Sequence, residues 1–141
     1  MNLCLMLKIL IMQGSTNNAS IEPYDSYFTH IVDTIQYDGE SIQIDLPFNF
    51  KLNHYDINTD HRAQSIYNSP YIPDDMLLCG SNDKITFTSI ARLQKASGDV
   101  IYGFDEDVIT PALYKYYKLI IISTQGRGLI GRIKFYGDIY A

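Results

Sequence analysis

The chain has 141 residues, of which 46% are hydrophobic and 19% are charged. This length fits one domain and allows a core to form without metal or disulfide support. The formal net charge is −5 and the basic residues are scattered along the chain. Both features argue against nucleic acid as a partner, because phosphates are bound by clustered Lys and Arg. The 12 tyrosines and the frequent isoleucines favour strands, because aromatic and β-branched side chains suit pleated sheets.

The N-terminal segment, residues 1–20, is expected to be a first strand followed by a polar loop. Residues 1–12 are apolar apart from Asn2 and Lys8, and this run is too short to span a bilayer. A signal peptide carries its positive charge before the apolar run, whereas Lys8 interrupts it. We therefore favour a strand over a targeting segment, and we expect no membrane span.

Two half-buried strands are predicted in the first half of the chain. Residues 41–46 alternate strictly between apolar and polar side chains, which is typical of a strand with one buried face. Pro47 is expected to end this strand. Residues 50–58 form the next one, with Tyr55 and Ile57 facing the core.

A hairpin and a further strand are predicted next. Residues 76–79 and 85–89 flank the loop 80–84, which is rich in residues that tolerate positive φ and therefore indicates a hairpin. Residues 99–104 form another strand, which the acidic residues 105–107 are expected to close as a turn.

The last two predicted strands differ in their patterns. Residues 116–122 are apolar on both faces, as expected of a central strand that is covered on both sides. Residues 129–136 alternate instead. Their inward-facing residues are Leu129, Ile133 and Phe135. Between the strands, residues 107–115 allow at most a turn or two of helix, because Pro111 lies inside them.

About eight short strands without a convincing helix predict an all-β fold, an antiparallel jelly-roll β-sandwich. We expect a single domain over residues 1–141. Cys4 and Cys79 lie far apart and match no metal-binding spacing, so they are expected to be buried or free thiols. This cysteine usage fits a reducing compartment.

Three segments of the chain carry a recognisable pattern. They are residues 37–47 (YDGESIQIDLP), residues 73–83 (PDDMLLCGSND) with Phe87 after them, and the ending that runs from residues 116–119 (YYKL) to residues 135–137 (FYG). In this order they resemble the galactose-binding-like family, which includes the discoidin and coagulation factor 5/8 C-type domains. The resemblance implies a non-catalytic sandwich that binds ligands through loops at one end.

The chain departs from the family pattern at three positions. Ser41 and Phe87 stand where the family usually has tryptophan. Arg132 stands where many relatives have an acidic residue that helps to hold a structural calcium, and Lys134 follows it on the same face. A guanidinium in that place opposes a cation, so the sequence predicts no cofactor and no metal ligand, with the family's structural calcium as the less favoured alternative.

Motifs for catalysis or metal binding fail on their context. Residues 126–131 match G-x-G-x-x-G, but a dinucleotide site needs a helix to open there, and a hairpin turn is expected instead. Residues 56–60 resemble the start of an EF-hand loop, yet His61 and Tyr67 replace its glycine and its closing glutamate. No nucleophile and base are paired in any recognisable motif, so we expect no enzyme activity.

Residues that suit sugar binding occur in three predicted loops. Sugars are bound by an aromatic face, which packs against the C–H surface of the ring, beside polar groups for the hydroxyls. The candidate ligand-binding residues are Tyr27, His30, His61, Arg62, Tyr71 and Arg127. The alternative is that the tyrosines pack the end of the sandwich while their hydroxyls reach water.

Two functions from different classes therefore remain open. The first is a binding module for glycans or for a protein surface. The second is a structural or assembly protein, such as a minor virion or capsid component of a large DNA virus or phage, because no clear secretion signal is present and the composition suits an AT-rich genome. That second reading favours assembly with other virion proteins, and a virion or cytoplasmic assembly site over secretion.

Overall fold

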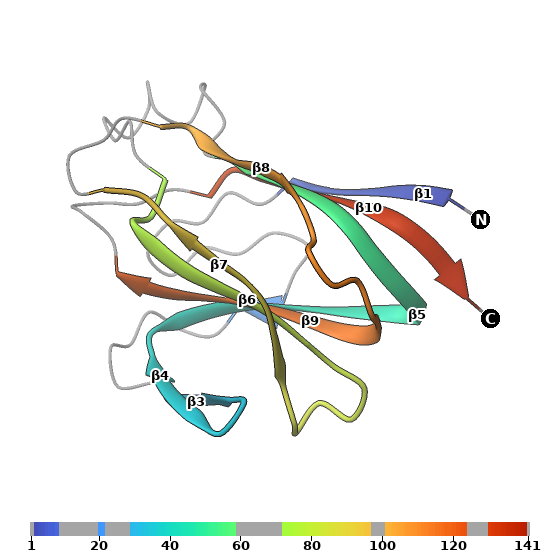
Figure 1. The fold of residues 1–141 in the computed structure, drawn as a ribbon, viewed down its shortest axis with the longest axis horizontal. Helices are drawn as coiled ribbons and strands as arrows, with labels where there is room; N and C mark the ends of the chain where they lie inside the picture. The colour runs from blue at the N-terminus through green and yellow to red at the C-terminus, as the bar shows by residue number, and fades with distance from the viewer. Residues whose placement is uncertain are drawn as a thin grey trace.

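The computed structural model describes residues 2–8, 20–21, 29–58, 72–96, 101–123 and 130–140. Within these ranges every regular element is a strand (Figure 1). The strands are β1 (Asn2–Lys8), β2 (Ser20–Ile21), β3 (Thr29–Val32), β4 (Ile35–Asp38), β5 (Glu40–Asn58), β6 (Asp75–Ser81), β7 (Thr88–Gln94), β8 (Gly103–Asp107), β9 (Leu113–Ser123) and β10 (Arg132–Tyr140). The all-β prediction is confirmed.

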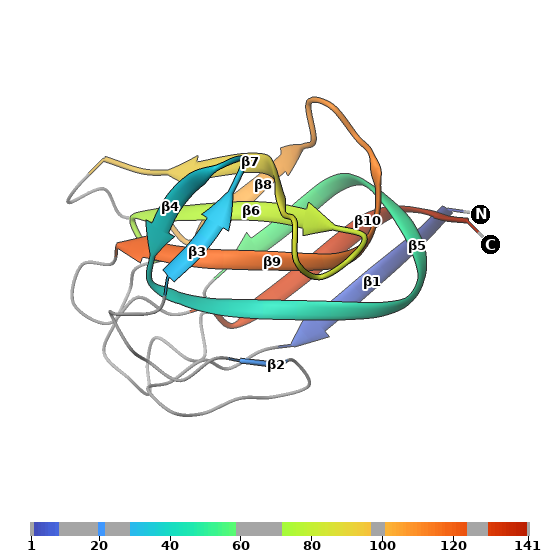
Figure 2. The ribbon, with the colours of Figure 1, turned by 90° about the horizontal axis from the view of Figure 1, so that it is seen from below.

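Eight of the described strands form one antiparallel sheet that folds over itself into two layers. The order is β1-β10-β5-β9-β6-β7, and β2 and β8 also pair with β5. The 19-residue strand β5 belongs to both layers, since its first half pairs with β9 and its second half with β10 and β8. Figure 2 shows β5 running away and then back, so that its two ends lie on the same side. The result is an antiparallel sandwich that is nearly closed into a barrel.

The main core lies between the two layers and contains a group of aromatic rings. Tyr117 from β9 is fully buried between Phe50 of β5 and Phe135 of β10, with ring centroids 6.4 Å and 5.4 Å away. Its hydroxyl donates a 2.6 Å hydrogen bond to the backbone carbonyl of Phe50. The predicted inward residues Tyr55 and Ile57 are buried here as well, because alternate residues of a strand face the same side.

A second, smaller cluster lies on the outer face of β6 and β9, where the hairpin β3–β4 covers it. Its buried members are Val32, Leu77, Cys79, Phe87 and Ile120. The hairpin is fastened by its turn residue Asp33, whose N–H donates to the carbonyl of Phe87 while its carboxylate accepts from the N–H of Ser89. This cover explains why the predicted central strand is apolar on both faces, and that prediction is confirmed.

The two family positions that lack tryptophan are both buried. Ser41 is fully enclosed and pairs with Ile120 across β5 and β9. Phe87 lies in the second cluster and carries the ammonium of Lys118 over its ring, 4.2 Å from the centroid. Phe87 therefore contributes an aromatic ring to the cluster that the hairpin covers.

Two boundary predictions around β5 and β7 are wrong. Pro47 does not end a strand, because β5 continues through it and the pairing with β9 shifts between Asp45 and Phe50. A proline has no N–H to donate and is tolerated where ladder pairing is interrupted. The strand expected at residues 85–89 begins only at Thr88, because Asp83 accepts hydrogen bonds from the N–H groups of residues 85 and 86 and holds a turn there.

The acidic residues 105–107 are also misplaced by the sequence prediction, since they form the second half of strand β8 and not a turn. All three pair with residues of β5 in register. The turn or two of helix allowed over residues 107–115 does not form, and β9 begins at Leu113 instead.

Candidate functional site

The strand ends next to the predicted ligand-binding loops lie on one side of the sandwich. In one layer Asn58, the last residue of β5, pairs with Arg132, the first residue of β10. In the other layer Asp75, the first residue of β6, pairs with Ser123, the last residue of β9. Because both ends of β5 lie on the same side (Figure 2), these pairs mark the same end of the molecule. We call it the loop end, defined by Asn58, Asp75, Ser123 and Arg132.

Five of the six candidate ligand-binding residues lie outside the described residues and stay predictions. They are Tyr27, His61, Arg62, Tyr71 and Arg127. The undescribed segments that contain His61, Arg62, Tyr71 and Arg127 begin and end at or near the four residues that define the loop end. The described strands on either side of these segments therefore lie at the same end of the molecule.

His30, the sixth candidate, lies in β3 and is only 5% exposed. Its Nε2 is 2.9 Å from the backbone carbonyl oxygen of Gly39, and its Nδ1 is 3.4 Å from Nζ of Lys118. The carbonyl can only accept and the ammonium can only donate, so the proton of the neutral ring belongs on Nε2. This placement ties His30 to the hairpin, and its contact with a ligand stays a prediction.

A polar group at the loop end was missed by the sequence analysis. Arg92 of β7 donates two hydrogen bonds to Asp75, from Nε at 2.6 Å and from Nη2 at 2.7 Å, and its guanidinium lies 5.5 Å from the ring centroid of Tyr37. This bidentate interaction lowers the pKa of Asp75, because the guanidinium of Arg92 stabilises the charged carboxylate. The guanidinium remains partly exposed, so it can also donate to a ligand hydroxyl.

A second acid–base pair lies directly beside this group. Nζ of Lys95 is 2.6 Å from Oδ1 of Asp74, and the Lys95 side chain is only 2% exposed. The backbone N–H of Lys95 also donates to the carbonyl of Asp74. These two bonds join the start of β6 to the end of β7 at the loop end.

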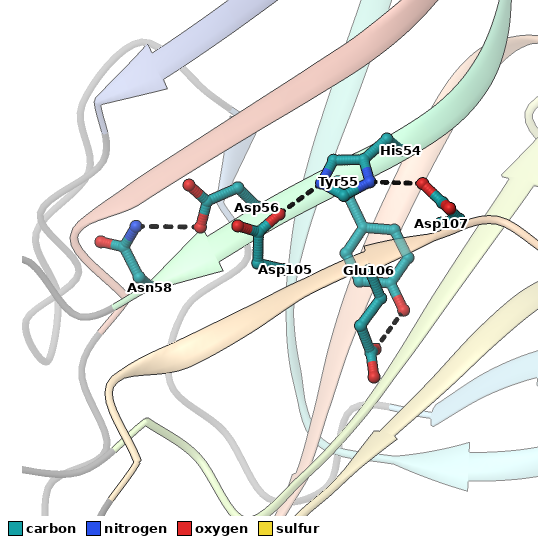
Figure 3. A network of polar contacts seen from close by, with 7 residues as sticks. All are labelled: His54, Tyr55, Asp56, Asn58, Asp105, Glu106 and Asp107. Carbon is teal, nitrogen blue, oxygen red and sulfur yellow. Dashed lines mark hydrogen bonds and ion pairs between the residues drawn. The ribbon is translucent and has the colours of Figure 1, made fainter.

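The outer face of β5 and β8 carries a separate polar network (Figure 3). His54 of β5 lies between two aspartates of β8, with Nδ1 2.7 Å from Oδ1 of Asp107 and Nε2 in contact with Oδ1 of Asp105. Glu106, between these aspartates in the sequence, points to the other face of β8, where the hydroxyl of the buried Tyr55 donates to it at 2.6 Å. Burial, followed by Glu106, raises the pKa of Tyr55.

Among the described residues no three His, Cys, Asp or Glu side chains are grouped so that they could hold a metal ion. Asp56 and Asn58 belong to the segment that resembled the start of an EF-hand loop. They lie two residues apart in β5, and the side-chain amide of Asn58 donates a 3.1 Å hydrogen bond to the carboxylate of Asp56. The described part of the chain also contains no helix that could cross a membrane.

No protein-family model matches the chain, and no curated protein matches it. Solved structures do match. CpGH89CBM32-6 produced by Clostridium perfringens is 12% identical, with a TM-score of 0.59 over 96% of this chain and 94% of that one. The family 32 carbohydrate-binding module of C. perfringens NanJ, in complex with galactose, is 12% identical, with a TM-score of 0.54 over 96% and 93%.

A third match, CpGH89CBM32-5 from C. perfringens in complex with GalNAc-β-1,3-galactose, is 10% identical, with a TM-score of 0.50 over 99% of this chain and 95% of that one. At these identities the likeness concerns the fold alone. The chain therefore has the galactose-binding-like fold of the coagulation factor 5/8 C-type, and the resemblance seen in the sequence is confirmed at that level.

Proposed function

We propose that the chain is a non-catalytic module that binds glycans through its loop end. The observation that carries the proposal is the match, over nearly the whole chain, to modules that were solved with galactose and with GalNAc-β-1,3-galactose. A galactose-type sugar is accordingly the first ligand to test. Each match also covers at least 93% of the solved chain, so the likeness is not restricted to one motif.

The arrangement of the described strands supports this function physically. Binding residues often lie on loops that a rigid sheet holds in place, and here the strand ends beside the candidate loops are paired and fixed by the Asp75–Arg92 and Asp74–Lys95 bonds. An aromatic ring, a guanidinium and a carboxylate already lie together at this end in Tyr37, Arg92 and Asp75. These are the group types that bind the C–H face and the hydroxyls of a sugar.

The test is a glycan array probed with the purified chain, once with calcium and once with chelator. We expect selective binding to glycans that end in galactose or GalNAc, and we expect Arg62→Ala and Tyr27→Ala each to weaken it by about tenfold or more, as removal of a central contact does. Tyr140→Ala is the matched control, since Tyr140 is exposed and pairs with Asn49 at the opposite end of β5's second half.

If a folded sample binds no glycan on the array, either with calcium or with chelator, the glycan proposal is wrong. The remaining candidate would then be the structural or assembly protein, whose ligand is another protein. Its localisation at a virion or a cytoplasmic assembly site belongs to that alternative.

A further inference from the structure

The His54 network has a geometry that neutral histidine cannot satisfy. Both ring nitrogens face an aspartate oxygen, Nδ1 towards Asp107 and Nε2 towards Asp105. Ionised carboxylates only accept hydrogen bonds, and a neutral imidazole has a single N–H to donate. Only the imidazolium, with two N–H groups, satisfies both partners. When the ring is neutral, one nitrogen lone pair must face a carboxylate.

The network holds an edge strand. Among the described strands β8 pairs with β5 alone. It begins at Gly103, which pairs with Asn58 at the loop end, and it ends at Asp107, which pairs with His54. The two aspartates are largely exposed, with side-chain exposures of 68% and 89%, and each of them contacts a ring nitrogen of His54.

The other titratable or charged groups near His54 lie on β5 and β10, and in the described part of the chain none of them is hydrogen-bonded to its ring. Asp56 lies on the same face of β5 two residues on, and Lys134 of β10 pairs with Asp56. The ring of Tyr136, also on β10, meets the His54 ring edge-on at 5.5 Å. Asp138 accepts a hydrogen bond from Asn53 at 3.2 Å and lies further along β10.

We propose that His54, Asp105 and Asp107 form a pH-sensitive clamp, which holds edge strand β8 on β5 while His54 is protonated and loosens when the ring loses its proton. The inference concerns strand docking and does not rest on glycan binding. Loosening would leave the backbone pairing, the packing of Phe104 and Val108 in the main core, the Tyr55–Glu106 bond and the N–H of Val108 bonded to Asn53 as the remaining attachments of β8.

The direction of the pH effect follows from the titration of His54. The hydrogen bond to Asp107, and after it the bond to Asp105, raises the pKa of His54 above its ordinary value of 6.5. A group whose pKa is higher in the folded state contributes its full stabilisation below pH 6.5 and loses it as the pH rises through the folded-state pKa. The clamp is therefore closed in mild acid and opens on the alkaline side.

The first test follows the imidazole signals of the full chain by NMR between about pH 5 and about pH 9. The His54 signal is the one that disappears in His54→Gln. We expect its midpoint above 6.5 and expect it to fall towards that value in the double variant Asp105→Asn/Asp107→Asn. Glu106→Gln is the matched control, because Glu106 lies between the two aspartates but bonds Tyr55. A wild-type midpoint at or below 6.5, or one that the double variant leaves unchanged, overturns the proposal.

The second test measures strand docking itself in the wild-type chain. Amide hydrogen exchange of β8 is compared with that of β6 at about pH 5.5 and about pH 8.5, after correction for the intrinsic rates. We expect the protection of β8 to fall relative to that of β6 by up to about tenfold per pH unit within the titration window, which is the limit for one proton. A parallel change in both strands contradicts the clamp.

Discussion

Replacing Tyr117 with alanine is expected to destabilise the fold by about 4 kcal/mol, in the range found for buried aromatic residues. Tyr117 is fully buried, and its ring packs against Phe50, Phe135 and Tyr114. Alanine removes these contacts and leaves a cavity between the two layers. It also removes the hydroxyl partner of the Phe50 carbonyl. Urea unfolding followed by circular dichroism measures the loss.

Two variants separate the packing of Tyr117 from its hydrogen bond. Tyr117→Phe keeps the ring and should cost about 1–2 kcal/mol, because it leaves a buried carbonyl without its donor. Tyr116→Ala is the matched control at the next position, where the ring faces the other side of β9 and is half-buried, and its cost should stay near 1 kcal/mol. Equal losses at positions 116 and 117 would contradict the placement of the core.

The strands that follow a simple rule of alternation could be predicted from the sequence. Residues 41–46 and 50–58 alternate, and both lie in β5 with Ile42, Tyr55 and Ile57 buried. A period of two is a local property and needs no knowledge of the partner strand. That these two stretches are one strand serving both layers could not be predicted, because Pro47 is a local signal for a break, and the pairing on either side of it involves β9, β8 and β10.

Strand β8 shows why a local signal can mislead. Three consecutive acidic residues favour an exposed turn by composition. In the structure they are held in the sheet by His54 and Tyr55, about 50 residues earlier in the sequence. The hairpin β3–β4 was not predicted either, although the apolar outer face of the central strand indicated that something must cover it.

The ligand-binding loops stay a prediction, because most of their candidate residues lie outside the described residues. The described strands beside several of these loops do meet at the loop end. Arg92, Asp75 and Tyr37 come together only through strand pairing and hairpin packing. Asp75 lay in a segment that resembles the family, whereas no feature of the sequence around Arg92 marked it.

Gly137→Ala is expected to cost at least about 3 kcal/mol, because no room exists for a side chain there. A Cβ at this position would lie 1.9 Å from the backbone carbonyl oxygen of Lys51 and 3.0 Å from the Phe50 ring. Gly137 belongs to β10 at the register shift after Tyr136, and it pairs with β5 on one side and β1 on the other. Relief of the contact therefore requires the backbones of β10 and β5 to move apart, which weakens the layer that also holds β8.

The neighbouring Asp138→Ala serves as the matched control in the same unfolding experiment. It adds no atoms and removes one hydrogen bond to Asn53, so its cost should stay near 1 kcal/mol. Amide hydrogen exchange distinguishes a small local shift around Gly137 from a separation of strands β10 and β5. If the two strands move apart, the β8 amides of Gly137→Ala should lose protection more than those of β6, since β8 is attached through β5 alone among the described strands. A Gly137→Ala chain as stable as the wild type would show that the close approach of β10 to β5 is wrong.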